Sequence, residues 1–190
     1  MLNSFFATPV WITDCDSVTQ GRIHDEIDRV LDPDRIQNRP WEDLVKSTFT
    51  YEGTDDFARF SLKRLQSFIE QNVKAYAQSL GARQDLGLME SWFNRYDQGD
   101  FQFDHCHANR AVSGVYYYQA EPGQGDLRLI TPNPAQWLSL WPADTVSSQG
   151  VQIPAVTGRL VLFPGWLTHR VCPNAVNSDR PRISVSFNYQ

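Results

Sequence analysis

The stretch Leu88-Met-Glu-Ser-Trp-Phe-Asn-Arg-Tyr96 carries side chains that alternate between two faces, as they do in a β-strand. One face holds every second residue, namely Leu88, Glu90, Trp92, Asn94 and Tyr96. Before Gly87 the apolar residues recur with the period of a helix, and after it with the period of a strand. A turn at 97–100 follows, and we expect further short strands at residues 102–107, 111–119, 126–130, 159–163, 168–172 and 182–189.

The residues before Gly87 predict one strand and two helices. The strand covers residues 6–12, and residues 14–17 after it include good N-cap candidates. A first helical stripe contains Ile23 and Ile27, continues through Val30 and Leu31, and stops at Asp32-Pro33. A second stripe ends at Gly81 and consists of Leu62, Leu65, Ile69, Val73, Tyr76 and Leu80.

Length and composition predict one globular domain. A chain of 190 residues with 41% hydrophobic and 13% aromatic residues is long and apolar enough to bury a core. Roughly eight short strands and two helices indicate an α+β, mainly β fold, which means a sandwich, jelly roll or barrel. We expect residues 1–87 to supply a strand and helices packed on the outside, and residues 88–190 to form the β core.

Charge and cysteine content exclude several classes of partner. A net charge of −5 argues against a dedicated surface for nucleic acid or anionic membrane. The first nine residues lack the features of a signal peptide, and no apolar run is long enough to cross a bilayer. The three cysteines form an odd count without paired spacing, which predicts reduced thiols and a cytoplasmic location.

Three of the four histidines form a pattern that suits a metal ion. His105 and His107 flank Cys106 in a predicted strand, where residues two apart point the same way. His169 follows in Phe163-Pro-Gly-Trp-Leu-Thr-His169, a turn that leads into another strand. If these strands face each other across the mouth of a barrel, three imidazoles hold one metal and leave positions for other ligands.

The same spacing has simpler explanations. Two histidines two apart also occur as a solvated pair or as an adventitious metal site, and His24 is expected to be an ordinary surface or core residue. Imidazole suits iron, zinc, copper and nickel alike, so the ligand type does not fix the metal. A zinc hydrolase fits three histidines as well, but the sequence offers no obvious general base for it.

Five stretches resemble one enzyme family when they are taken in order. They are Trp92-Phe-Asn-Arg-Tyr-Asp-Gln-Gly99, Phe101-Gln-Phe-Asp-His105-Cys-His107, Ser113-Gly-Val-Tyr-Tyr-Tyr118, Leu162-Phe-Pro-Gly-Trp-Leu-Thr-His169 and Arg182-Ile-Ser-Val-Ser-Phe-Asn188. The chain resembles the 2-oxoglutarate- and Fe(II)-dependent dioxygenases of the prolyl-4-hydroxylase-like superfamily, above all a small branch found in bacteria and phages. The resemblance implies a double-stranded β-helix (jelly roll, cupin-like) for residues 88–190.

The resemblance implies that His105 is the first metal ligand and His169 the distal one. Prolyl hydroxylases have an aspartate two residues after the first histidine, where this chain has His107. A three-histidine site with His107 as a ligand is one possibility, and a two-histidine site completed by solvent or Asp104 is another. We favour His107, because a regular strand points Asp104 away from His105.

The resemblance also implies a site for 2-oxoglutarate. Arg182 is the expected partner of its distal carboxylate, since a guanidinium pairs with a carboxylate through two hydrogen bonds. Arg180 shares the same face and is the alternative, while Tyr117 matches a tyrosine that binds the same carboxylate in prolyl hydroxylases. The remaining candidates for contact with the co-substrate or substrate are Asn94, Tyr96, Ser184 and Asn188.

The implied activity is the hydroxylation of an unactivated C–H bond, on a peptidyl or free amino acid for example. The implied cofactors are Fe(II) and 2-oxoglutarate, with ascorbate as a reductant that keeps the iron active. Dioxygen is the co-substrate, and 2-oxoglutarate is converted to succinate and CO2. The competing classes are a three-histidine thiol dioxygenase, which needs no 2-oxoglutarate, and a non-catalytic metal-binding jelly roll. The sequence does not identify the substrate or the oligomeric state.

Overall fold

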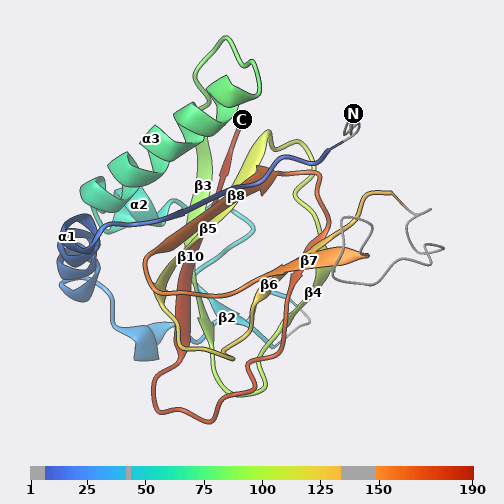
Figure 1. Cartoon of the computed structure of the whole chain (residues 1–190). Coiled ribbons are helices and arrows are strands. Elements are labelled where there is room, and N and C mark those ends of the chain that lie inside the picture. The colour runs from blue at the N-terminus through green and yellow to red at the C-terminus, as the bar shows by residue number, and fades with distance from the viewer. Residues whose placement is uncertain (1–6, 42–43, 134–148) are drawn as a thin grey trace.

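The computed structural model describes residues 7–41, 44–133 and 149–190. Within them, two sheets with antiparallel strand pairs lie one against the other (Figure 1). The larger sheet runs, in spatial order, β1 (Trp11–Asp14), β8 (Arg159–Pro164), β5 (Val112–Gln119), β10 (Arg182–Tyr189), β3 (Leu88–Tyr96) and β2 (Lys46–Ser47). The smaller sheet runs β4 (Gln102–His105), β9 (His169–Val171), β6 (Leu127–Ile130) and β7 (Gly150–Ile153).

In the described part of the chain, three α-helices and one 3-10 helix precede most of the strands. They are α1 (Ser17–Asp28), η1 (Pro33–Arg35), α2 (Asp56–Arg59) and α3 (Lys63–Ser79). The Asp16 side chain caps α1 by accepting hydrogen bonds from the backbone N–H groups of Val18 and Thr19. Figure 1 shows α1 and α3 on the outer side of the larger sheet.

Two apolar layers hold this arrangement together. The outer layer joins the buried faces of α1 and α3 to the larger sheet, through residues such as Ile27, Ile69 and Val185. The inner layer lies between the two sheets and joins Val161 of β8 to Leu129 of β6. Because alternate side chains of a strand point to opposite faces, β5 and β8 contribute to both layers.

The structure confirms the mainly β class with helices packed outside, and it corrects several boundaries. The first strand was expected at 6–12, but β1 begins at Trp11, and Phe6 lies outside the described residues. The first helix was expected to reach Leu31, but α1 ends at Asp28, before Asp32-Pro33. Two short elements, β2 and α2, and the strand β7 were not predicted, because segments of two to four residues are too short to show a period.

Gly114 is a point at which the larger sheet tolerates no side chain. A Cβ atom there would lie 2.5 Å from the ring of Phe187 and 2.7 Å from Leu162. We expect Gly114→Ala to lower the free energy of unfolding by about 1–3 kcal/mol, because an extra methyl group would force buried neighbours aside. Urea denaturation measures the change.

The matched control is Gly21→Ala on α1, where an added Cβ would meet nothing within 4 Å. This change should raise the free energy of unfolding by about 0.5–1 kcal/mol, because alanine loses less backbone freedom than glycine in a helix. If both variants unfolded at the same urea concentration, close packing around Gly114 would not contribute to the free energy of unfolding.

In the part of the chain that the structure describes, no helix has the length and apolar character needed to cross a membrane.

Candidate active site

His105 and His169 are direct neighbours across two paired strands. The register of β4 and β9 sets His105 opposite His169, and their ring centroids are 4.2 Å apart. The expectation that their strands face each other across the mouth of a barrel is therefore wrong, since β4 and β9 are hydrogen-bonded neighbours in the smaller sheet. Opposed residues on one face of a sheet have Cβ atoms about 5 Å apart, which brings the imidazoles together.

His107 reaches the same place from outside a strand. β4 ends at His105, so the pair is not carried by one regular strand as expected. The backbone N–H of His107 instead donates to the carbonyl of Gly165, at the turn between β8 and β9. A Cβ at Gly165 would lie 2.4 Å from the backbone oxygen of Arg110, so glycine permits this close approach of two loops.

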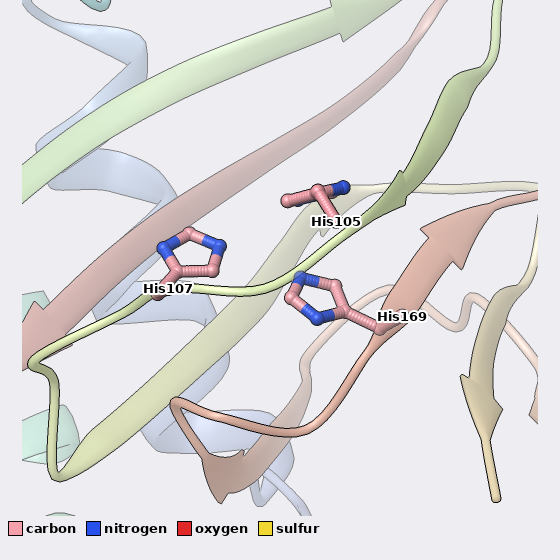
Figure 2. Close-up of side chains that lie close together, drawn as sticks. All are labelled: His105, His107 and His169. Atoms are coloured by element: carbon pink, nitrogen blue, oxygen red, sulfur yellow. The ribbon is translucent and has the colours of Figure 1, made fainter. Parts of the chain in front are cut away.

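The three rings turn toward one another (Figure 2). One ring nitrogen from each of His105, His107 and His169 lies within 4.8 Å of the others. The Nδ1 atom of His105 is 2.7 Å from the Phe103 carbonyl, and that of His169 is 2.9 Å from the Leu167 carbonyl. A carbonyl only accepts, so both Nδ1 atoms carry a proton, and in a neutral ring this leaves Nε2 with a lone pair for a metal.

Burial keeps two of the rings neutral. It lowers the pKa of His107 to about 4, and the charges of His105 and Arg110 act in the same direction. Burial also holds the pKa of His169 well below its ordinary value, since only 5% of this residue is exposed. Neutral imidazole is the form that binds metal ions, so neither of these two rings has to lose a charge before a metal binds at neutral pH.

A cavity of about 310 Å³ opens beside the histidines. Its walls come from both sheets and include the three histidines. They also include four other residues that were predicted from the sequence as site residues, namely Tyr96, Tyr117, Arg182 and Ser184. Aromatic residues form another part of the wall: Trp41, Phe49, Trp92 and Phe103. The cavity therefore joins a histidine cluster, a cation and an aromatic surface in one space.

Arg182 is the buried cation of this cavity. Only 1% of the residue is exposed, and its guanidinium carbon lies 3.9 Å from the centre of the Tyr96 ring and 5.5 Å from that of Tyr117. One of its N–H groups donates to the carbonyl of Gly125, whereas its Nε atom is buried without a hydrogen-bond partner. Within the described residues no carboxylate pairs with Arg182, so its charge is free for an anionic ligand.

Four other residues nominated from the sequence lie outside the cavity wall. The Arg180 side chain is 68% exposed and donates to the side chain of Gln119. Asn94 donates to Ser186, and Asn188 contacts His107 rather than the co-substrate space. The carboxylate of Asp104 is 3.7 Å from the guanidinium of Arg170 and is not part of the histidine cluster.

Sequence reasoning missed two residues that shape the site. Glu90 lines the cavity and accepts hydrogen bonds from Asn188 and Arg110. The carbonyl of Gly125 orients Arg182, and a φ of 90° at this residue favours glycine. An inward-facing carboxylate in the alternating strand β3 was a usable signal for Glu90, but no local pattern identifies a single backbone carbonyl as a partner.

The residues present fit both cofactors of a non-haem iron oxygenase. The three clustered imidazoles, two of which burial keeps neutral, suit a divalent transition metal such as Fe(II). The unpaired Nε of Arg182 is a buried donor that a carboxylate of 2-oxoglutarate would satisfy. Two facing sheets with a cavity between them and such a histidine cluster in its wall have the arrangement of a double-stranded β-helix that can bind a metal.

Solved structures support that class. The chain aligns with a 2OG-Fe(II) oxygenase-family oxidoreductase from Burkholderia pseudomallei at a TM-score of 0.66 and 13% identity, covering 95% of this chain and 84% of that one. For a prolyl-4-hydroxylase from Pseudomonas putida the TM-score is 0.64 and the identity 19%, with 97% of this chain and 93% of that chain covered. For HygX from Streptomyces hygroscopicus, solved with nickel, 2-oxoglutarate and hygromycin B, the TM-score is 0.55 and the identity 14%, with 96% of this chain and 82% of that chain covered.

At these identities the solved structures establish the fold alone, and no curated protein sequence matches the chain. The family is established by sequence. A family model described as "Putative 2OG-Fe(II) oxygenase" matches residues 90–188, which is more than half of the chain. The chain belongs to this family, so it is an oxidoreductase that uses Fe(II), 2-oxoglutarate and dioxygen. The resemblance inferred from the motifs, together with the activity class and cofactors that it implied, is confirmed.

Proposed function

We propose that this oxygenase hydroxylates an unactivated C–H bond, that His105, His107 and His169 bind its iron, and that Arg182 binds the distal carboxylate of 2-oxoglutarate. The observation that carries the proposal is the pairing of a histidine cluster with a buried, unneutralised arginine in one cavity. An isolated buried charge is unfavourable unless a ligand of opposite charge pairs with it.

Several contacts support Arg182 over Arg180 as the carboxylate partner. Tyr96 and Tyr117 flank the guanidinium of Arg182 and restrict its orientation, and the Gly125 carbonyl restricts it further. Arg180 is exposed, where water screens its charge and weakens any ion pair. A preorganised, dry guanidinium loses less entropy when it pairs with a carboxylate.

Iron and 2-oxoglutarate, once bound, supply the oxidising chemistry by reacting with dioxygen. The chain's own residues have a different task, which is to hold the reactants in a fixed orientation and to exclude water. Val115 and Leu127 line the cavity and favour a dry space around the co-substrate.

The aromatic wall supports an uncharged substrate group. The Trp41 and Phe49 rings are stacked with centroids 5.1 Å apart, and Phe49 meets Trp92 edge to face at 5.4 Å. Among the described residues, Glu90 and Arg182 are the charged lining groups apart from the histidines. Glu90 is already paired with Arg110, so the substrate side favours an apolar group with C–H bonds to oxidise.

The anaerobic absorption spectrum tests this proposal. Adding 2-oxoglutarate to the Fe(II)-loaded protein should produce a visible charge-transfer band, because the keto acid chelates the metal through two oxygens. Slow release of succinate should follow when air is admitted without any other substrate. No band at millimolar 2-oxoglutarate would contradict the proposal and favour a thiol dioxygenase, while a band without succinate release would favour a binding protein.

We also propose a cytoplasmic location. Cys15, Cys106 and Cys172 are all free, and Cys106 is exposed. Exposed free thiols are typical of a reducing compartment and disfavoured in secreted proteins. Fractionation of cells expressing the full chain tests this, and recovery from an oxidising compartment would contradict it.

A further inference from the structure

His107 differs from the other two histidines in what contacts its Nδ1 atom. For His105 and His169 that contact is a backbone carbonyl two residues earlier. For His107 it is the side-chain nitrogen of Asn188, at 2.8 Å. Asn188 belongs to β10 of the larger sheet, so the third histidine is held from the sheet opposite the one that holds the other two.

The neighbours of Asn188 fix which way its amide points. Its nitrogen is 2.7 Å from an oxygen of Glu90, and its oxygen is 2.6 Å from the hydroxyl of Ser113. The same Glu90 oxygen is 3.2 Å from the guanidinium of Arg110, an ion pair in which the carboxylate can only accept. The Asn188 nitrogen must therefore face Glu90, and the amide oxygen is taken by Ser113.

The remaining N–H of the amide then determines the protonation of His107. An amide nitrogen has two donors and no acceptor, so His107 Nδ1 must accept the second one. A neutral imidazole that accepts at Nδ1 carries its proton on Nε2. The Nε2 atom of His107 thus presents an N–H to the cluster, where His105 and His169 present lone pairs.

We propose that Asn188, oriented by Glu90 and Ser113, is a positioning residue that sets the tautomer of His107 opposite to that of His105 and His169. In the metal-free protein His107 then has to rearrange before its Nε2 atom can bind a metal. Trp92 lies nearly parallel to the His107 ring, with centroids 6.0 Å apart and an interplanar angle of 21°, and limits how far the ring can turn.

Metal binding then requires a change in the tautomer of His107, an inference that rests on the proposed three-histidine site. The proton of His107 moves from Nε2 to Nδ1, and the Asn188 amide turns over so that its oxygen accepts it. The amide nitrogen then donates to Ser113, whose hydroxyl oxygen can accept. Glu90 must move off Asn188 and keep only Arg110, because the turned amide oxygen and the carboxylate oxygen are both acceptors. The number of protons on the protein is unchanged, and His107 becomes the last ligand to engage.

Nuclear magnetic resonance of the metal-free protein tests the tautomers directly. Long-range proton–nitrogen correlation spectra at neutral pH distinguish the two ring nitrogens, and single histidine substitutions assign them. We expect Nδ1–H for His105 and His169 and Nε2–H for His107. An Nδ1–H tautomer at His107 would overturn the proposal.

Two variants test the cause, each in the full-length protein. Asn188→Leu removes the donor and should leave His107 in a mixture of tautomers. Glu90→Gln removes the constraint on the amide and should shift His107 toward Nδ1–H, whereas a purely structural role for Glu90 predicts no shift. Asn94→Leu is the matched control, since Asn94 is an equally buried asparagine that donates to Ser186 and contacts no histidine. An unchanged His107 spectrum in both Asn188→Leu and Glu90→Gln would overturn the proposal.

Zinc titration separates this proposal from the three-histidine site. Zn(II) is diamagnetic, so the same spectra can follow His107 as the metal binds. Zn(II) should convert His107 to Nδ1–H in the wild type and bind Asn188→Leu about 10–100-fold more weakly, as is usual when the partner of a metal-bound histidine is removed. If His107 kept Nε2–H at saturating zinc, the three-histidine site would fail and the tautomer assignment would stand. Equal zinc affinity in wild type and Asn188→Leu would count against the positioning role alone.

Discussion

Arg182→Leu should weaken the binding of 2-oxoglutarate by about 100-fold, which corresponds to about 3 kcal/mol. The change removes a buried, charged hydrogen-bond donor. Among the described lining residues of the cavity, no other arginine or lysine remains to pair with the carboxylate. Titration of the anaerobic charge-transfer band gives the dissociation constant. Arg182→Lys should give an intermediate value, because lysine keeps the charge but loses the two-bond geometry.

The same variant should fold normally. Leucine removes a buried charge that has no carboxylate partner in the described part of the chain, and replacing such a charge with an apolar side chain is often neutral or stabilising. A lower affinity in a protein with unchanged urea stability would therefore report the lost contact rather than unfolding.

Arg180→Leu is the matched control, since it removes an exposed guanidinium two residues away. Its affinity for 2-oxoglutarate should equal that of the wild type. If Arg180→Leu weakened binding and Arg182→Leu did not, the co-substrate would occupy a different position from the one proposed.

His169→Ala should abolish metal binding and the release of succinate, with a loss of metal affinity of more than about 100-fold. This exceeds the range typical for residues that only support a ligand. His169 is buried next to His105, and among the described residues only His105 and His107 share a metal-ligand cluster with it, so no other described side chain can take its place. Isothermal titration with Fe(II) under anaerobic conditions measures the affinity, and His105→Ala should behave in the same way.

His24→Ala is the control for the loss of a histidine in general. His24 lies on α1, packs edge to face on Tyr118 at 4.9 Å, and has no part in the histidine cluster. Its metal affinity should match that of the wild type. Retention of tight Fe(II) binding in His169→Ala would contradict the assignment of this histidine as a ligand.

Local patterns in the sequence predicted the elements that extend over several residues. Alternation from Leu88 to Tyr96 and from Arg182 to Asn188 predicted β3 and β10 and their polar faces, and Asp16 lies among the N-cap candidates that were expected before α1. These predictions succeeded because period and capping depend on residues close together in the chain. Elements of two to four residues, such as β2 and α2, carry no such period and were missed.

Part of the candidate site could be predicted from the sequence, and part of it required the tertiary structure. His105, His107 and His169 stood out because few other histidines occur and because their motifs resemble a known family. The choice between Arg182 and Arg180 needed the structure, since both have the same parity and only the residue inside the paired strand is buried. The contact between Asn188 and His107 joins residues 81 positions apart and has no local signature.

By itself, the sequence determined the alternation of the strands, the two long helices and the types of side chain available for a metal and an acid. Tertiary structure alone decided that β4 and β9 are neighbours, that Asn188 contacts His107, and that Glu90 and Ser113 orient it. The physical reason is the separation along the chain of the residues that interact. Periodicity and capping act over a few residues, whereas strand pairing and burial depend on which distant segments share a core.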